Sequence, residues 1–156
     1  MSTGHLDGAS AAPVPTVLDV HNLRIEFPLR QRALVAVDGV SFNIGKGEIL
    51  GVVGESGAGK SLTGSALIGL LQPPGRIASG TIHLSGKRID DLPQTEQRKL
   101  RGRHIGAIFQ DPLTSLDPLF TVGRQLTETI RAHQPVGADA ARAKALTLLR
   151  EVGIAD

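Results

Sequence analysis

The stretch that decides the fold is Gly54-Glu55-Ser56-Gly57-Ala58-Gly59-Lys60-Ser61, which fits the pattern G-x-x-x-x-G-K-[ST]. The apolar run Ile49–Val53, which has the length of a strand, precedes it. Residues Leu62–Leu71 follow, with apolar side chains at the spacing of a helix. A strand, a glycine-rich loop and a helix in this order are the context that a phosphate-binding loop requires. The sequence therefore predicts that the chain binds a nucleoside triphosphate.

The residue types in this loop suit a chain of phosphates. Gly57 and Gly59 permit backbone angles that strain other residues, so successive amides can point toward one phosphate group. A helix that begins near Lys60 adds the positive end of its dipole. We expect Lys60 to reach the β- and γ-phosphates of ATP and the Ser61 hydroxyl to coordinate Mg²⁺. A flexible Gly/Ser loop is the alternative, and the two flanking segments favour the phosphate interpretation. The residues expected to contact the nucleotide in this segment are Gly54, Glu55, Ser56, Gly57, Ala58, Gly59, Lys60, Ser61 and Leu62.

Length and composition are those of an ordinary globular protein. The 156 residues suffice for one domain with a core, and 40% of them are apolar and 21% charged. A formal charge of +2 is too small to argue for binding to nucleic acid or to an anionic membrane. The absence of cysteine excludes disulfides and thiolate metal sites. No apolar run approaches the roughly 20 residues needed to cross a bilayer, and Met1–Thr16 lacks the features of a secretory signal. Any link to a membrane would have to come through a partner.

Hydrophobic patterns along the chain predict strands separated by turns. Val17–Phe27 alternates apolar and polar residues, whereas Ile49–Val53 is free of polar residues, as expected for a parallel strand covered on both faces. Gln72–Gly80 is rich in Pro and Gly and is expected to be a loop. Ser85-Gly86 is expected to form a turn. The expected strands are Val17–Phe27, Leu34–Ile44, Ile49–Val53, Thr81–Leu84 and Ile105–Phe109.

Helices are expected at Leu62–Leu71, Gln94–Arg101, Thr121–His133 and Ala138–Val152. The last of these places Ala141, Ala145, Leu148 and Leu149 on one face. We interpret the basic cluster as a solvated surface; it consists of Arg98, Lys99, Arg101, Arg103 and His104. The expected organisation is a disordered leader at 1–16, a nucleotide-binding core at 17–110, and a further segment at 111–156.

The most particular motif is Phe109-Gln110-Asp111-Pro112, which continues into Leu113-Thr114-Ser115-Leu116-Asp117-Pro118. Together with the phosphate loop and the segment Ala36–Phe42, it resembles the ATP-binding subunit of an ABC transporter. More narrowly, it resembles the branch that imports dipeptides, oligopeptides or nickel. The resemblance runs from about Val17 to the last residue. It implies an α/β fold with a P-loop NTPase core of the ABC type, N-terminal antiparallel strands and the beginning of a helical subdomain.

The resemblance also implies roles for single residues. Phe27 would be the aromatic residue that stacks on adenine, and its alternative role is packing against the sheet. Gln110 would be the Q-loop glutamine, which contacts Mg²⁺ or the attacking water and acts with Lys60 in catalysis; its alternative role is that of a surface turn residue. The flexible segment after Gln110 would link the state of the nucleotide to the helical subdomain.

The partners implied by the resemblance are transmembrane permease subunits, a second ATP-binding subunit, and indirectly a substrate-binding protein. Two ATP molecules would be sandwiched between the two ATP-binding subunits. The protein would lie at the cytoplasmic face of the inner membrane as a peripheral subunit. The transported solute, whether peptide, nickel or another, stays open.

Three parts that this resemblance demands do not occur in the 156 residues: a Leu-Ser-Gly-Gly signature, a strand ending in Asp-Glu, and a later switch histidine. Leu84-Ser85-Gly86 imitates the signature, but it precedes Gln110 and is followed by Lys87. We expect an N-terminal portion of a longer subunit, with an incomplete domain that binds nucleotide and hydrolyses it at or near background. The strand Ile49–Val53 would then present an unpaired apolar edge that promotes association.

Two other interpretations of the residues are a soluble phosphate-loop enzyme and a nucleotide-binding module without catalysis. The first, a small-molecule kinase for example, would use Asp111 as a Mg²⁺ ligand and would need lid arginines, for which Arg124 and Arg131 are the candidates. A signature sequence and an Asp-Glu pair encoded beyond Asp156 would favour the transporter over both.

Overall fold

The computed structural model describes residues 14–111 and 115–154. These divide into two compact units, one up to Arg98 and one from Lys99 onward. The expected leader falls for the most part on residues 1–13, which lie outside the described residues, as do Pro112, Leu113 and Thr114 of the expected Q-loop segment.

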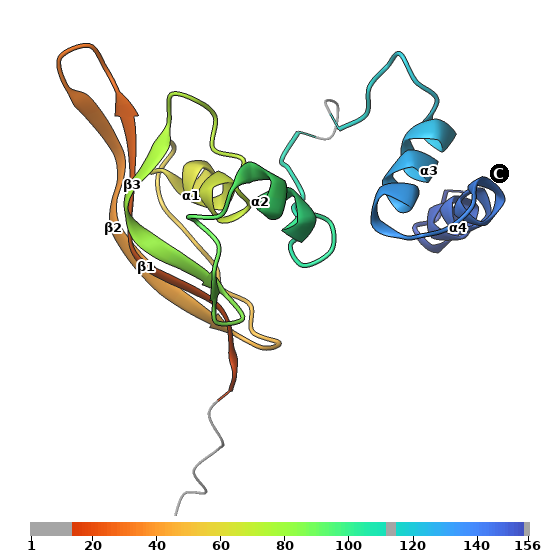
Figure 1. Ribbon diagram of the computed structural model, residues 1–156, viewed down its shortest axis with the longest axis horizontal. Coiled ribbons are helices and arrows are strands. Elements are labelled where there is room, and N and C mark those ends of the chain that lie inside the picture. The colour runs from red at the N-terminus through yellow and green to blue at the C-terminus, as the bar shows by residue number, and fades with distance from the viewer. Residues whose placement is uncertain (1–13, 112–114, 155–156) are drawn as a thin grey trace, which may run out of the picture. The chain divides into compact units, whose positions relative to one another are not determined.

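The first unit is built on an antiparallel sheet with the strand order β2-β1-β3-β4 (Figure 1). Its strands are β1 (Thr16–Pro28), β2 (Ala33–Gly45), β3 (Arg76–Leu84) and β4 (Lys87–Arg88). The two long N-terminal strands confirm the alternating patterns, and each neighbouring pair is antiparallel as expected. Ser85 and Gly86 form the predicted turn with φ of 48° and 79°, the positive angles that a tight two-residue hairpin requires.

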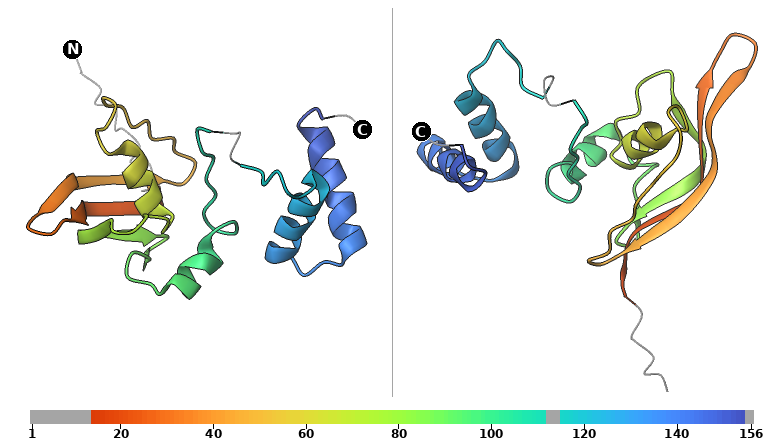
Figure 2. Two further views of the ribbon diagram at one scale, coloured as in Figure 1. Left: turned by 90° about the horizontal axis from the view of Figure 1, so that it is seen from above. Right: turned by 180° about the vertical axis from the view of Figure 1, so that it is seen from behind.

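The core of this unit lies on one face of the sheet. Val20, Leu23, Ile25 and Ile82 are at most 1% exposed, and they come from the two central strands. Helix α1 (Lys60–Leu67) lies over one face of the sheet, as Figures 1 and 2 show, and buries Ala66. Because α1 packs on the sheet and begins directly after the glycine-rich loop, it connects the loop to the sheet.

Strand β3 begins earlier than expected, because Arg76–Gly80 belongs to the strand and not to the preceding loop. Gly80 has a φ of 94° and lies beside Asn22, which has a φ of 47°, where the pairing of β1 with β3 is irregular. A Cβ at position 80 would lie 2.5 Å from the Asn22 carbonyl oxygen. The glycine therefore marks a bulge inside the strand, which the sequence pattern alone cannot distinguish from a loop.

Two expected strands do not form. Ile49–Val53 has no regular structure, and Ile49 and Val53 are 95% and 94% exposed. Ile105–Phe109 is likewise irregular, apart from a single bridge between Ile105 and Arg101. A parallel strand exists only where neighbours accept and donate its backbone hydrogen bonds, and the sheet of the described residues has no strand beside either segment. The prediction of two buried strands was therefore wrong for the described residues, because an apolar composition leads to burial only where neighbouring strands are present.

Helix α1 ends at Leu67, four residues before the expected end. Gly69 follows with a φ of 66°, and the amides of Gly69 and Leu70 donate to Ala66 and Ser65, as in a glycine-terminated helix. The next helix, α2, spans Gln94–Leu100 and confirms the expected short polar helix to within one residue.

In the second unit, helices α3 (Val122–His133) and α4 (Ala138–Glu151) pack side by side (Figure 1). Ile130, Ala141 and Ala145 form their shared core. Leu148, expected on the same buried face, is 43% exposed, because a single partner helix covers only a narrow stripe of α4. Within the described residues, no helix has both the length and the apolar character needed to span a membrane.

Candidate functional site: the phosphate-binding loop

The loop between Gly54 and Lys60 has the backbone that an anion site needs. The Ala58 amide donates to the Glu55 carbonyl at 3.2 Å and closes a tight turn. Gly57 and Gly59 adopt φ of 85° and 84°, the left-handed region that glycine enters without steric cost. Gly59 is also the N-cap of α1, with no side-chain cap. The prediction that these two glycines shape the loop is therefore consistent with its observed geometry.

Gly59 is required for a second reason that the motif does not reveal. A Cβ at this position would lie 2.8 Å from the Ala36 carbonyl oxygen and 2.8 Å from Val37 Cγ2, both on β2. Thr63 binds the same glycine from the other side, because its amide and its hydroxyl both donate to the Gly59 carbonyl, at 2.8 and 3.0 Å. The start of α1 is thus held against the sheet. Ala36, Val37 and Thr63 were not predicted as supports of the site, and only the Thr four residues after the glycine was a signal in the sequence.

Lys60 curls back over the loop that precedes it. Its Nζ donates to the carbonyl oxygens of Gly54 at 2.7 Å and Glu55 at 2.8 Å. The ammonium group is therefore held at the loop by two neutral acceptors. A phosphate oxygen is charged and is therefore a stronger acceptor for an ammonium group than a carbonyl oxygen. Lys60 is placed so that it could leave the two carbonyl oxygens and bind a phosphate at the loop.

Several amides of the loop are available as donors. Among the described residues, the amides of Gly57, Gly59 and Ser61 have no hydrogen-bond partner. The first amides of a helix lack intrahelical acceptors and carry the positive end of the dipole, so they favour an anion. Ser61 is exposed in the first turn of α1, where its hydroxyl is an oxygen ligand beside the same anion. One hydroxyl together with phosphate oxygens suits Mg²⁺, which binds proteins through few side chains when phosphates supply the rest.

Phe27 lies near the end of β1 and is half-buried. A Cβ on Gly75 would lie 2.9 Å from Phe27 Cε1 and 3.0 Å from Cζ, so the edge of the ring packs on the Gly75 backbone. This contact accounts for part of the ring surface and supports the packing role. Stacking on adenine stays a prediction.

Gln110 is exposed in a bend that follows the irregular segment 106–109. It does not lie at the end of a strand, because the expected strand before it does not form. Gln110 belongs to the second compact unit and the phosphate loop to the first. The catalytic role of Gln110 and its contact with Mg²⁺ stay predictions.

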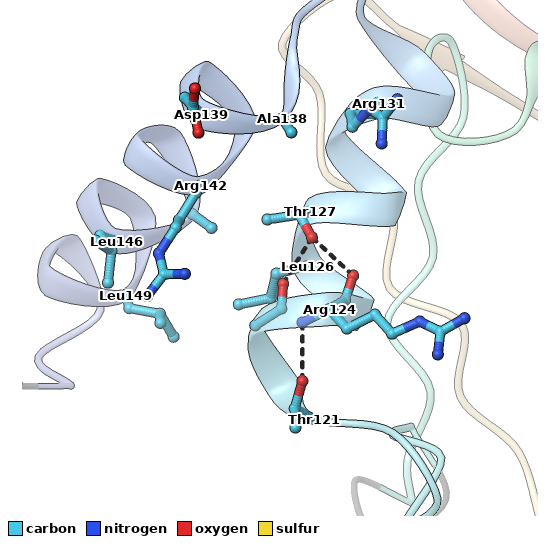
Figure 3. Close-up of a pocket in the computed structure, with 12 residues that line it drawn as sticks. Thr121, Arg124, Leu126, Thr127, Arg131, Ala138, Asp139, Arg142, Leu146 and Leu149 are labelled. Atoms are coloured by element: carbon cyan, nitrogen blue, oxygen red, sulfur yellow. Dashed lines mark hydrogen bonds between the residues drawn. The ribbon is translucent and has the colours of Figure 1, made fainter.

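A second concavity, of about 530 Å³, lies between α3 and α4 (Figure 3). Leu126, Leu146 and Leu149 line it together with Arg131 and Arg142. Both candidate lid arginines, Arg124 and Arg131, line the groove, and Arg124 also pairs with Glu128 at 2.8 Å. The groove combines an apolar surface with basic groups and lacks the tight backbone turn that marks the phosphate loop.

Comparison with known proteins agrees with this geometry. A family model described as ABC transporter matches residues 37–156. The oligopeptide transport ATP-binding protein OppD of Bacillus subtilis is 43% identical over 142 residues, which are 90% of this chain and 40% of that protein. The dipeptide transport ATP-binding protein DppD of Escherichia coli is 39% identical over 140 residues, 90% of this chain and 43% of that protein. The chain thus spans about two fifths of the length of these curated relatives.

Among solved structures, the dimeric ATP-binding cassette MJ0796 in a post-hydrolysis state, bound to ADP and Pi, has the same fold. The TM-score is 0.70 at 21% identity, over 85% of this chain and 56% of that one. The predicted fold, part of an ABC ATPase cassette with N-terminal antiparallel strands and following helices, is confirmed. The chain belongs to the ABC transporter family.

Proposed function

We propose that this chain binds MgATP as part of an ABC transporter subunit that couples ATP binding and hydrolysis to the import of peptides or a related solute. The observation that carries the proposal is the loop 54–61, in which the amides of Gly57, Gly59 and Ser61 have no acceptor within the described part of the chain and the Lys60 ammonium bonds back to the Gly54 and Glu55 carbonyls. The similarity to peptide-transport ATP-binding proteins over 90% of the chain supports the solute class. Family membership favours this function over that of a soluble kinase.

In this proposal, the chain's own groups bind and orient the triphosphate. The amides of Gly57, Gly59 and Ser61 donate to the phosphate oxygens, and Lys60 Nζ leaves the Gly54 and Glu55 carbonyls to bind the β- and γ-phosphates. Mg²⁺, when bound, neutralises charge that develops on the phosphates, and Ser61 would be its ligand from α1. Phe27 would stack on the adenine, and Gln110 would contact Mg²⁺ or the attacking water.

Hydrolysis also requires groups that activate water, and the 156 residues contain neither an Asp-Glu pair nor a Leu-Ser-Gly-Gly run. We expect the chain by itself to bind ATP and to hydrolyse it at or near background. In the intact system, two ATP-binding subunits would close on two nucleotides and drive transmembrane permease subunits, which a substrate-binding protein supplies with solute. The protein would then lie at the cytoplasmic face of the inner membrane.

The test is substitution of Lys60 by Ala, with Lys46→Ala as the matched control. Both changes remove one positive charge, but Lys46 is exposed in the turn after β2 and lies outside the phosphate-loop motif 54–61. A charge-assisted contact to phosphate contributes about 1.5–3 kcal/mol, so Lys60→Ala should weaken MgATP binding roughly tenfold or more in titration calorimetry. Equal ATP affinity in the Lys60 variant and the control would contradict the proposed function.

A further inference from the structure

One side chain of α3 holds the loop that precedes this helix. Gln125 Nε2 donates to the carbonyl oxygens of Asp117 and Phe120, each at 2.9 Å. Gln125 Oε1 accepts from the Asp117 amide, also at 2.9 Å. The side chain therefore reaches both ends of the four-residue segment Asp117–Phe120, which we term the Gln125-held loop.

The chemistry of the amide group makes this arrangement specific to glutamine. A glutamine amide has two N–H donors and one oxygen acceptor, and all of these functions are used here. A leucine of similar size would make none of the three bonds. A glutamate would keep the acceptor but lose both donors, and it would place a carboxylate against two carbonyl oxygens.

Contacts around Gln125 add to the ordering of the same loop. Asp117 Oδ1 accepts from the Leu119 amide at 2.9 Å, which closes a turn inside it. Thr121 caps α3 by accepting from the Arg124 amide at 3.3 Å (Figure 3). The Arg124 guanidinium lies 4.3 Å from the centre of the Phe120 ring. The loop is thus tied to the first turn of the helix at several points, and its two ends are bonded to each other by the Phe120 amide, which donates to the Asp117 carbonyl at 3.3 Å, as well as to Gln125.

We propose that Gln125 is a positioning residue that makes the loop Asp117–Phe120 and helix α3 move as one rigid piece. The inference rests on the proposed function, in which the segment after Gln110 carries the state of the nucleotide to the helical region. A loop that is bonded to the helix at both ends transmits a displacement to it. A loop that has lost these bonds absorbs the same displacement by changing its own conformation.

The experiment compares Gln125→Leu and Gln125→Glu in the full-length subunit, alone and assembled with its permease subunits in lipid vesicles. Gln134→Leu is the matched control, because it makes the same change at the C-terminal end of α3 and removes a side-chain bond with Lys144 at 2.9 Å, which does not involve the loop. Three quantities are measured: the KM for ATP, the stimulation of kcat by the permease subunits, and amide hydrogen exchange of Asp117.

For Gln125→Leu we expect Asp117 to exchange about tenfold faster, because its acceptor is lost. The KM for ATP should stay within about twofold, and stimulation by the permease subunits should fall about fivefold or more, the lower range of measured coupling between sites. Gln125→Glu should lose stimulation as well, which keeps the test valid where the leucine variant fails to fold.

Unchanged exchange at Asp117 in Gln125→Leu, which removes the acceptor of the Asp117 amide, would overturn the inference, because the loop would then not depend on Gln125. Faster exchange with full stimulation would also overturn it, because the loop would then be held without a role in coupling. A rise in the KM for ATP equal to the loss of stimulation would place Gln125 in nucleotide binding and not in positioning. A failure of the proposed function is separate, since it would appear in the Lys60→Ala titration whatever the Gln125 variants do.

Discussion

Replacing Gly59 by Ala should destabilise the first unit more than any other glycine substitution in the phosphate loop. Two effects combine at this position. The φ of 84° is costly for a residue with a Cβ, and the new methyl group would lie 2.8 Å from both the Ala36 carbonyl oxygen and Val37 Cγ2. Neither neighbour can yield easily, because one is backbone and the other is a buried valine that is 5% exposed.

The magnitude follows from separating the two effects. A left-handed backbone angle costs an alanine about 1–2 kcal/mol, and an overpacked methyl group costs about 1–3 kcal/mol more. Gly57 isolates the first effect, because its φ is 85° and a Cβ there would meet nothing within 4 Å. Gly64 is the control in which neither effect occurs, because it lies inside α1 and a Cβ there would meet nothing within 4 Å. Gly64→Ala should therefore stabilise the protein by about 0.5–1 kcal/mol.

The assay is urea unfolding of the three variants without nucleotide, followed by circular dichroism. With a slope of about 1–3 kcal/mol per molar urea, the Gly59 variant should unfold at a midpoint roughly 1 M below that of Gly57→Ala. The Gly64 variant should unfold at or above the midpoint of the unchanged protein. If the Gly59 and Gly57 variants unfolded at the same urea concentration, the close approach of the loop to β2 would not contribute to stability, and the reasoning would fail.

Two further predictions concern the sheet. Asp90 accepts from the Ile82 amide at 2.7 Å and pairs with Arg88 at 2.8 Å, with only 5% of its side chain exposed. Burial by itself raises the pKa of Asp90, but the hydrogen bonds from Arg88 and Ile82 outweigh it and hold this pKa below its usual value. The ionised Asp90 should therefore stabilise the fold above the unfolded-state pKa, and this stabilisation should be lost as the pH falls below about 4. Asp90→Asn should lower the free energy of unfolding by about 1–3 kcal/mol at pH 7 and make the urea midpoint less sensitive to acid. Phe27→Leu keeps an apolar contact with Gly75 but removes the ring face that would stack on adenine. The affinity for ATP should therefore fall about two- to tenfold, with little change in the midpoint of urea unfolding. An unchanged affinity for ATP would show that Phe27 has a packing role alone.

Local patterns predicted those parts of the fold whose partners are near in sequence. Strands β1 and β2 form a hairpin, so the alternation in Val17–Phe27 and Leu34–Ile44 already contained both sides of the pairing. The phosphate loop is also local, because the positive φ of Gly57 and Gly59 and the return of Lys60 to Gly54 all occur within a few residues. Such features depend on short-range sterics and hydrogen bonds, which a motif encodes directly.

Glycine was ambiguous for a physical reason. Gly80 and Gly69 both have positive φ, yet the first lies within a strand at a bulge and the second ends a helix. The residue type reveals that the backbone needs freedom, but the direction of the chain on either side depends on which segment pairs with it. The early start of β3 and the early end of α1 therefore could not be read from composition.

The burial of a segment and the contacts of a functional side chain depend on other parts of the chain that are distant in sequence or lack regular structure. Sequence patterns predicted these features least well. Ile49–Val53 has the composition of a buried strand, but composition does not supply the neighbouring strand that its backbone needs, and the segment is left exposed. Gln125 shows the same limit for a polar residue. In the sequence it is one glutamine in the first turns of a helix, whereas in the structure it binds two carbonyls and one amide of a loop that has no periodic pattern. Side-chain bonds to irregular backbone depend on the path of the loop, which no periodic sequence pattern specifies, so sequence patterns do not identify residues of this kind.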